Sequence, residues 1–570
     1  MREPAGENAA ALQRQGAQWR ESAHYVQAER CLLRALALEH DFAAAHLELG
    51  LTYRAQNKLE DAIDYFQLAV HFAPRCVAAW IELGAALDSL GRADAALAAC
   101  RQATMLDPPN CAAWLGLARL HKAREDWQLS IDCYRTAVAC DPASADARCL
   151  LGYALYKAGD YAESRTQFDA ALQISPNLVQ AHHNLGLLYL ELAEPTEALA
   201  CFSRALAIEP QLLETRTGLA HALRDLGRLD DAIGHYDRVL ATEGKFADAV
   251  INRSYALLMK GDFAGGWAAY DERFASGGET GRNFPYPPWR GEALAGKRVL
   301  VYAEQGLGDE IMFASCLPEL LALGGHCVIE CSARLAPLFT RSFPAAYVRG
   351  GGKQDDQQWL ANLPPIDCQT AIGSLPRYFR REAADFPARA GYLAAAAARI
   401  EHWRNRLASD GRLRVGIAWR GGTLRSRQFA RSIPLPLWAP LVGNDRAVFY
   451  ALQYGDIAAE LADFRGGSGA SVMHLGSAVD DLDELAAIIG ALDLVISVDN
   501  TVAHLAGALG KPVWSLLSCS PEWRYPRSGE AMPWYPSMRL FHRAPAEARQ
   551  RIIERVAGQL AKSLQGPARA

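Results

Sequence analysis

The chain has 570 residues, too many for a single hydrophobic core, because domains cluster at about 100–200 residues. Half of the residues are hydrophobic, 22% are charged and the formal net charge is −5. This is the balance of a globular protein, and it excludes a strongly basic nucleic-acid-binding protein.

Cysteine usage and the N-terminus bear on the compartment. The 13 cysteines are an odd number, are scattered and include no C-x-x-C pair, which indicates reduced thiols rather than a disulfide framework. Residues 1–8 carry no apolar core of a signal sequence. No uninterrupted apolar run reaches the roughly 18 residues of a membrane span. We therefore expect a cytoplasmic protein with no membrane span.

The first half of the chain repeats itself every 34 residues or so. Each copy has a leucine followed by a small residue, then an aromatic residue or leucine, further small residues and usually a closing proline. The spacing matches the tetratricopeptide pattern and predicts an α-solenoid of about eight helical hairpins over residues 1–275. Clear copies begin at Leu49, Leu83, Leu117, Leu151, Leu185 and Leu219, with weaker copies near Leu12 and Leu257.

Stacked hairpins of this type form a curved solenoid with a concave groove, because one unit cannot bury its own apolar face. Such a groove commonly holds a peptide or protein, so we expect the repeats to bind a protein acceptor or partner. A spacer or a dimerisation arm is the alternative interpretation. No residue of the groove identifies a ligand.

Glycines and prolines between 276 and 297 predict an irregular linker. After it, Val299–Ala303 is expected to be a buried strand, followed by a glycine turn and a helix that Asp309 opens and that runs to about residue 323. Alternation of strands and helices indicates a parallel sheet, so 298–410 predict a Rossmann-like, acceptor-binding domain. Further elements are expected at 326–331, 346–348, 366–370 and 392–407.

A second α/β unit starts at the expected strand 413–419. Its most informative stretch is 494–517, where an apolar run, the helix-capping types Asp-Asn-Thr, a small-residue helix and a second apolar run follow one another. Residues 411–570 therefore predict a second Rossmann-like domain for a nucleotide-sugar. Two such domains leave a cleft between the carboxyl ends of their strands. Further elements are expected at 447–453, 485–492 and 545–564.

The turn of the first unit admits two interpretations. Gly306 and Gly308 begin a G-x-G-x-x-G fingerprint and Glu330 lies about 20 residues further on, as an NAD-linked enzyme requires. The third glycine is Ile311, however, and Asp309 would set a carboxylate where a pyrophosphate should lie. We therefore expect the glycines to bring a ligand close to Asp309, which removes the proton of an acceptor hydroxyl. A simple N-cap is the alternative for Asp309.

The turn of the second unit favours an anion. The start of the helix after Asp499 offers unpaired N–H groups and the positive end of the helix dipole. Thr501 adds a hydroxyl, and His504 lies four residues past Asn500 and faces the same turn. A helix cap without a ligand is the alternative for Asp499.

Arginines of the second unit supply the remaining charge of this expected site. Arg420 and Arg431 follow the first strand, and guanidinium groups bind phosphates in a bidentate manner. A diphosphate leaving group held in this way needs no metal. Asp481 and Asp483 mimic a D-x-D metal motif, but acidic residues at a helix start are commoner for dipole reasons.

Three stretches together resemble the heptosyltransferase-type glycosyltransferases of family 9, which have a GT-B fold of two Rossmann-like domains. They are G-L-G-D-E-I at 306–311, R-V-G-I-A-W-R at 414–420 and D-N-T-V-A-H-L-A-G-A-L-G-K-P at 499–512. P-E-W-R-Y at 521–525 and P-W-Y-P-S-M-R-L-F at 533–541 resemble the subgroup in which this domain follows tetratricopeptide repeats. Repeats followed by a GT-B fold are also similar to the protein O-linked N-acetylglucosamine transferases, whose motifs are not evident.

The resemblance implies an inverting, metal-independent transfer of a sugar from a nucleotide diphosphate sugar to a hydroxyl acceptor, without a further cofactor. Thr501 stands where the family has a small residue and Arg431 where it has a lysine, which leaves the donor open. A protein-interaction scaffold with an inactive transferase domain is the rival. By position, the resemblance implies Asp309 and His504 as catalytic residues and Gly306, Gly308, Arg420, Arg431, Asp499, Asn500 and Thr501 as donor-binding residues.

Overall fold

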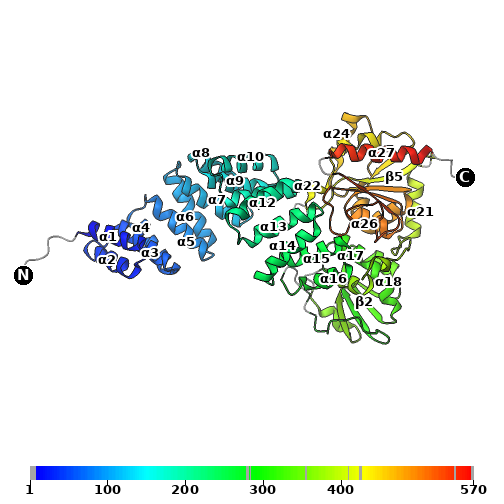
Figure 1. Ribbon diagram of the computed structural model, residues 1–570, viewed down its shortest axis with the longest axis horizontal. Helices are drawn as coiled ribbons and strands as arrows, with labels where there is room; N and C mark the ends of the chain where they lie inside the picture. The colour runs from blue at the N-terminus through cyan, green and yellow to red at the C-terminus, as the bar shows by residue number, and fades with distance from the viewer. Residues whose placement is uncertain are drawn as a thin grey trace, which may run out of the picture. The chain divides into compact units, whose positions relative to one another are not determined.

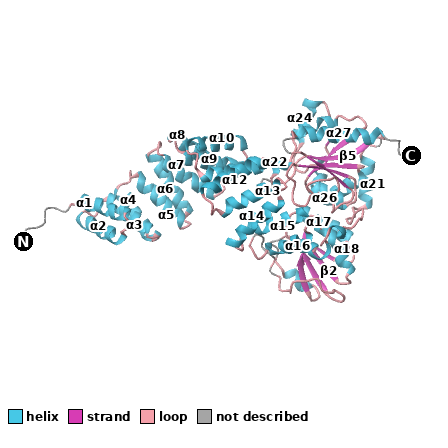
Figure 2. Cartoon of the chain, viewed as in Figure 1, coloured by secondary structure: helices cyan, strands magenta, loops and turns pink. Residues whose placement is uncertain are grey.

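The computed structural model describes residues 8–277, 282, 284–352, 356–408, 410–422, 427–544 and 547–565. The chain divides into two compact units, one of residues 1–188 with 207–209 and one of residues 189–206 with 210–570. Figure 1 labels the elements along the chain. Figure 2 shows helices alone in the N-terminal part and two groups of strands in the C-terminal part.

Sixteen helices, paired as eight hairpins, fill the described chain up to residue 270, which confirms the predicted repeats. Glycine lets the two helices of a hairpin approach closely: a Cβ at Gly50 would lie 2.6 Å from the Phe66 ring, and one at Gly152 would lie 2.8 Å from Phe168. The helices are α1 (Ala9–Glu21), α2 (Tyr25–Leu38), α3 (Ala43–Ala55), α4 (Leu59–Phe72), α5 (Val77–Ser89), α6 (Ala93–Leu106), α7 (Cys111–Ala123), α8 (Trp127–Cys140), α9 (Ala145–Ala158), α10 (Tyr161–Ile174), α11 (Val179–Glu191), α12 (Pro195–Ile208), α13 (Leu213–Asp225), α14 (Leu229–Thr242), α15 (Ala247–Lys260) and α16 (Phe263–Tyr270).

Of the expected linker, residues 278–281 and 283 lie outside the described residues. Its later part runs along the edge of the first sheet. The backbone N–H of Trp289 donates to the Gln369 carbonyl over 2.8 Å, and Gln369 N–H donates to the Pro287 carbonyl over 2.9 Å. These bonds continue the ladder of β4, so the linker satisfies an edge that would otherwise be open.

The first sheet has four parallel strands in the order β3-β2-β1-β4. The order reverses between β1 and β4, and ligands bind outside the carboxyl ends of strands at such a point. The turn that follows β1 therefore lies at a binding position. The strands are β1 (Arg298–Tyr302), β2 (His326–Ser332), β3 (Tyr347–Gly351) and β4 (Cys368–Ala371), and the helices are α17 (Leu307–Phe313), α18 (Leu317–Ala322), α19 (Ala336–Ser342), α20 (Pro376–Phe379) and α21 (Ala397–Arg406).

The helix after β1 differs from the prediction. It starts at Leu307, two residues before Asp309, and Gly306 is its N-cap. A 3-10 turn at Ala314–Cys316 then separates α17 from α18. The prediction that Asp309 opens this helix, and its alternative as an N-cap, are therefore both wrong. Asp309 lies in the first turn, where the positive helix end favours a carboxylate.

The second sheet has six parallel strands in the order β10-β9-β8-β5-β6-β7. Numbered from β5, this is the doubly wound order 3-2-1-4-5-6, with its switch point between β5 and β8. The loop after β5 and the turn after β8 therefore meet. The strands are β5 (Leu413–Ala418), β6 (Ala447–Ala451), β7 (Val472–Met473), β8 (Leu494–Val498), β9 (Val513–Leu517) and β10 (Met538–His542), and the helices are α22 (Gln428–Arg431), α23 (Ala439–Val442), α24 (Ala458–Ser468), α25 (Leu482–Ala491), α26 (Thr501–Ala508) and α27 (Arg549–Gln565).

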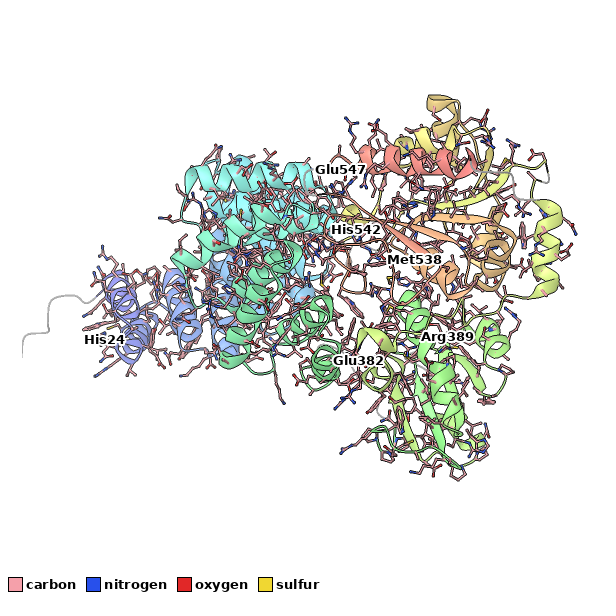
Figure 3. All side chains as sticks on the ribbon, turned by 45° about the vertical axis from the view of Figure 1, so that its right-hand side comes forward. His24, Glu382, Arg389, Met538, His542 and Glu547 are labelled. Carbon is pink, nitrogen blue, oxygen red and sulfur yellow. The ribbon has the colours of Figure 1, made fainter. Side chains whose placement is uncertain are left out.

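Strand β8 is buried along its whole length, as its apolar run predicted. Ile496 and Val498 pack in one cluster with Ile552 of α27, while Val495 packs in another with Ala486 of α25. Strands β7 and β10 were not predicted. Figure 3 labels Met538 and His542 at the two ends of β10, which closes the sheet beside β9. None of the described helices combines the length and apolar character that crossing a membrane requires.

Candidate functional site

The turns that follow β1 and β8 face each other. Helices α17 and α26 lie side by side (Figure 1) and are in contact. A Cβ added to Gly308 would lie 3.3 Å from His504 Cδ2 and 3.9 Å from Thr501 Oγ1. The structure therefore brings together the two turns that the sequence marked as separate candidate sites. A side chain at 308 would crowd His504, so glycine suits this close approach of the two helix starts.

Asp309 crosses this junction by an ion pair. Its carboxylate accepts a hydrogen bond from the Arg524 guanidinium, which belongs to the second α/β domain. Both side chains are mostly enclosed, with 18% of Asp309 and 11% of Arg524 exposed. The residue that the sequence identified as a base thus has a cation from the facing domain as its partner.

Arg431 and Asp499 form a second ion pair behind the first. Arg431 Nη2 donates to the Asp499 backbone carbonyl over 2.9 Å and lies 3.1 Å from Asp499 Oδ1. Asp499 is 3% exposed, and neither of its carboxylate oxygens has a partner with hydrogen-bond geometry among the described residues. A buried carboxylate with unused acceptor capacity favours a ligand that brings hydroxyl or N–H groups.

Glu522 joins the two arginines. Its Oε1 lies 3.6 Å from Arg431 Nη1 and its Oε2 lies 4.0 Å from Arg524 Nη1. The group thus contains three carboxylates, of Glu522, Asp309 and Asp499, and two guanidiniums. Burial alone would lower the pKa of Arg524, but these three acids outweigh it and raise the pKa above its ordinary value. Both guanidinium groups are therefore charged at physiological pH.

His504 is enclosed between two tyrosines. Its Nδ1 lies 3.0 Å from the Tyr535 hydroxyl and its Nε2 lies 3.4 Å from the Tyr525 hydroxyl. Burial, followed by the charge of Arg524, lowers the pKa of His504 from 6.5 to about 3. The imidazole is therefore neutral at physiological pH. With both nitrogens facing hydroxyls, its surroundings suit positioning of the turn better than transfer of a proton to a substrate.

Asn500 caps helix α26 with its side chain. Its Oδ1 accepts from Ala503 N–H over 3.2 Å and from Ser497 Oγ over 2.9 Å, and its Nδ2 donates to the Arg420 carbonyl over 3.0 Å. The expectation that the first N–H groups of this helix are all unpaired is therefore wrong at Ala503. Asn500 fixes the turn on which Asp499 and Thr501 lie, and its own polar atoms are engaged within the protein.

The loop after β5 contributes its backbone rather than the Arg420 guanidinium. That guanidinium lies 3.5 Å from Glu460 of α24, while the Arg420 carbonyl accepts from Asn500. A Cβ at Gly421 would lie 2.5 Å from the Asp499 carbonyl oxygen. Only glycine fits where this loop crosses the turn. The sequence thus placed Arg420 in the correct loop, but the side chain pairs elsewhere.

Four residues of the site were not predicted individually: Glu522, Arg524, Tyr525 and Tyr535. The first three stand together in the stretch P-E-W-R-Y. A buried arginine needs an acid, and two acids with no assigned partner, Asp309 and Asp499, were already candidates. Charge pairing would have pointed to a further arginine, although not to this one.

Two alternative interpretations lose support: an NAD site that uses Glu330, and a metal site at Asp481 and Asp483. Arg282 donates to both oxygens of Glu330 at 2.7 and 2.9 Å, and Glu330 is 2% exposed, so this acid is not available for the ribose that an NAD enzyme binds. The Asp481 side chain accepts from the N–H groups of Asp483 and Glu484 and caps α25, as the dipole interpretation held. In the part of the chain that the structure describes, no three His, Cys, Asp or Glu residues are placed to hold a metal ion.

A cavity of about 230 Å³ adjoins Arg524. One wall comes from α15 and α16, the last repeat, and another from the segment 523–534. Arg524 is one of its lining residues, and the Trp523 ring stacks on Tyr255 of α15 with centroids 5.0 Å apart. The cavity therefore connects the end of the repeats with the partner of Asp309. Its aromatic lining residues are Phe263, Trp267, Phe386, Trp523, Tyr525 and Trp534.

Comparison with protein families gives two kinds of match. Tetratricopeptide repeat models match residues 20–75, 77–110, 115–178, 179–212 and 217–279. The model of glycosyltransferase family 9 (heptosyltransferase) matches residues 478–553, which contain β8, α26, Arg524 and Tyr535. The N-terminal region therefore consists of tetratricopeptide repeats, and the second α/β domain carries a family 9 segment.

Among curated proteins, "Protein FlbA" of Caulobacter vibrioides is 36% identical over 301 residues, which are 50% of this chain and 50% of that protein. The chain thus matches about half the length of this relative. Among solved structures, a thermophilic tetratricopeptide repeat protein of Thermus thermophilus is 29% identical over 32% of this chain and 100% of its own, with a TM-score of 0.28. PilF of Pseudomonas aeruginosa is 16% identical over 36% of this chain and 95% of its own, with a TM-score of 0.34.

Proposed function

Since the chain carries tetratricopeptide repeats and a glycosyltransferase family 9 segment, we propose that it transfers a sugar from a nucleotide diphosphate sugar to the hydroxyl of an acceptor. One observation carries this proposal. The turn with Asp309 and the turn with Asp499 meet at the switch points of two doubly wound sheets, where such folds bind their ligands.

In the proposed reaction, Asp309 accepts the proton of the acceptor hydroxyl. The hydroxyl oxygen forms a bond to the anomeric carbon from the face opposite the diphosphate, and the bond between that carbon and the phosphate oxygen breaks. The electron pair leaves with the nucleoside diphosphate, so the configuration at the anomeric carbon inverts.

The guanidinium of Arg431 stabilises the charge that develops on the leaving diphosphate. Arginine supplies this charge without a metal ion, and the donor enters as a substrate, so the reaction needs no further cofactor. Asp499 binds donor hydroxyls with its unused acceptor capacity, and Thr501 offers its hydroxyl beside it. His504, neutral and held by two tyrosines, positions the turn. This refines the expectation that His504 is itself catalytic.

The acceptor in this proposal is a polypeptide held by the repeats. The aromatic cavity lies between the last repeat, at α15 and α16, and Arg524, the partner of Asp309. In this proposal, the part of the acceptor next to the last repeat enters this cavity beside the proposed base. Tetratricopeptide repeats bind peptides in their grooves, which supports a protein acceptor over a free sugar.

The rival function, an interaction scaffold with an inactive transferase domain, makes a different prediction. Titration calorimetry with a panel of nucleotide diphosphate sugars on the full chain separates the two. We expect one donor class to bind, and Arg431→Lys to weaken it about tenfold, because lysine cannot form the bidentate contact. Absence of binding by every donor, with the chain folded by circular dichroism, would favour the scaffold.

A further inference from the structure

We infer that Arg431 and Arg524 form one diphosphate site, which the protein's own carboxylates, Glu522 and Asp309, occupy until a donor displaces them. This inference rests on the proposed function and adds a second arginine to it. It also gives donor binding a consequence, because Asp309 loses its partner when the donor takes Arg524.

The position of Glu522 supports the first part. Its two carboxylate oxygens reach one arginine each, at 3.6 Å from Arg431 and 4.0 Å from Arg524. A single bidentate anion therefore already bridges the two guanidiniums. Glu522 is 25% exposed, compared with 13% for Arg431 and 11% for Arg524, so solvent reaches the anion more readily than the cations.

Loose geometry makes this carboxylate replaceable. Both of its distances exceed the 2.7–2.9 Å or so of a charge-assisted hydrogen bond, so each ion pair has room to shorten around a larger anion. Nε of Arg524 also has no hydrogen-bond partner among the described residues. A diphosphate brings more charge and more acceptor oxygens than a carboxylate, and an arginine offers five N–H donors. The site therefore has capacity that its present occupants leave unused.

Asp309 is the second occupant. One of its oxygens accepts a hydrogen bond from Arg524 across the junction between the two turns. This bond engages one of the two carboxylate oxygens of Asp309 with a residue of the facing domain. When Arg524 turns to a diphosphate, that oxygen becomes free. The exchange therefore releases an oxygen of the proposed base when the donor is in place, which couples donor binding to the contacts of Asp309.

A double-mutant cycle on the full-length protein tests the exchange, with inorganic pyrophosphate as the probe and calorimetry as the readout. If Asp309 competes for Arg524, Asp309→Asn should bind pyrophosphate about fivefold more tightly, because the competing charge is gone. Arg524→Gln should weaken binding about tenfold or more. In the Arg524→Gln background, Asp309→Asn should then give no gain.

Glu530→Gln is the matched control, since it also removes one negative charge from an arginine pair in the same domain, with Arg539 at 2.8 Å. It should leave pyrophosphate binding unchanged. Glu522→Gln should tighten pyrophosphate binding as Asp309→Asn does. If Arg524→Gln does not fold, this variant tests instead whether a carboxylate competes with pyrophosphate for the two arginines. Equal or weaker binding by both Asp309→Asn and Glu522→Gln would overturn the inference and leave the proposed function standing. Failure of every variant to bind either pyrophosphate or any nucleotide diphosphate would overturn both.

Discussion

The two turns that meet at the site are built in opposite ways. The turn before α26 is closed within its own domain, since Asn500 caps the helix and Arg431 of α22 donates to the Asp499 carbonyl. The turn before α17 has a glycine as N-cap, and its acid depends on a residue of the other domain. One turn is locally complete, and the other is completed across the junction.

This difference suggests separate roles for the two turns: the turn before α26 positions a ligand, and the turn before α17 carries the proposed base. Asp499 is 3% exposed and fixed by its own domain, as suits a group that holds a ligand in one orientation. Asp309 keeps 18% of its side chain exposed and pairs with Arg524 of the other domain, which suits the role of base that we propose for it. Changes at the turn before α17 should therefore affect turnover, and changes at the turn before α26 should affect stability.

The largest expected effect is on turnover. Asp309→Asn keeps an oxygen for Arg524 but removes the base, so transfer should fall about 10²–10⁴-fold. The measurement is single-turnover transfer with the donor that binds, under saturating acceptor. Asp410→Asn, which neutralises an exposed acid paired with Arg412, is the control and should retain full activity. Full activity of Asp309→Asn would remove this residue from the reaction.

A smaller effect is expected in the pH dependence of stability. Burial lowers the pKa of His504 to about 3, so below pH 6.5 the unfolded chain binds a proton that the folded protein excludes. The free energy of unfolding therefore falls as the pH falls from about 6.5 towards 3, by up to about 1.4 kcal/mol per pH unit. His504→Gln does not titrate and lacks this loss.

The test compares urea unfolding of the wild type and His504→Gln at pH 6.5 and pH 4.5. The wild type should be the more stable at pH 6.5, and its advantage should shrink by about 2–3 kcal/mol at pH 4.5. Tyr535→Phe, which removes one hydroxyl partner but leaves the imidazole, should follow the pH dependence of the wild type. Parallel curves for wild type and His504→Gln would show that the imidazole is not held neutral.

Local patterns in the sequence predicted the turn before α26 well. The apolar run of β8, the capping types after it and the small-residue helix are neighbours in the chain, and their structure depends on one another. The 34-residue repeats were predicted for the same reason, because each hairpin contacts mainly its neighbours. Strand β10 was missed because prolines at 533 and 536 and several aromatic residues hid its short alternation.

Pairing across the junction could not be predicted in the same way. Arg524 lies 215 residues from Asp309 in the chain, and no local pattern relates them. The same holds for the hydroxyl of Tyr535, which lies 31 residues from the His504 ring that it contacts. A sequence indicates which charged residues need partners. Which residue becomes the partner depends on how the two sheets place the loops at the carboxyl ends of their strands.

The smallest expected effect tests whether the turn before α26 is complete in itself. Asn500→Ala removes the cap of α26 and should lower the free energy of unfolding by about 1 kcal/mol, as loss of an N-cap does. Asn500→Ser keeps a capping oxygen and should recover most of that loss, although it lacks the amide N–H that donates to the Arg420 carbonyl. Urea unfolding measures both variants, and pyrophosphate binding should change little in either. If serine were as destabilising as alanine, the bond to the Arg420 carbonyl, rather than the cap, would be what holds the turn, and the loop after β5 would then be part of it.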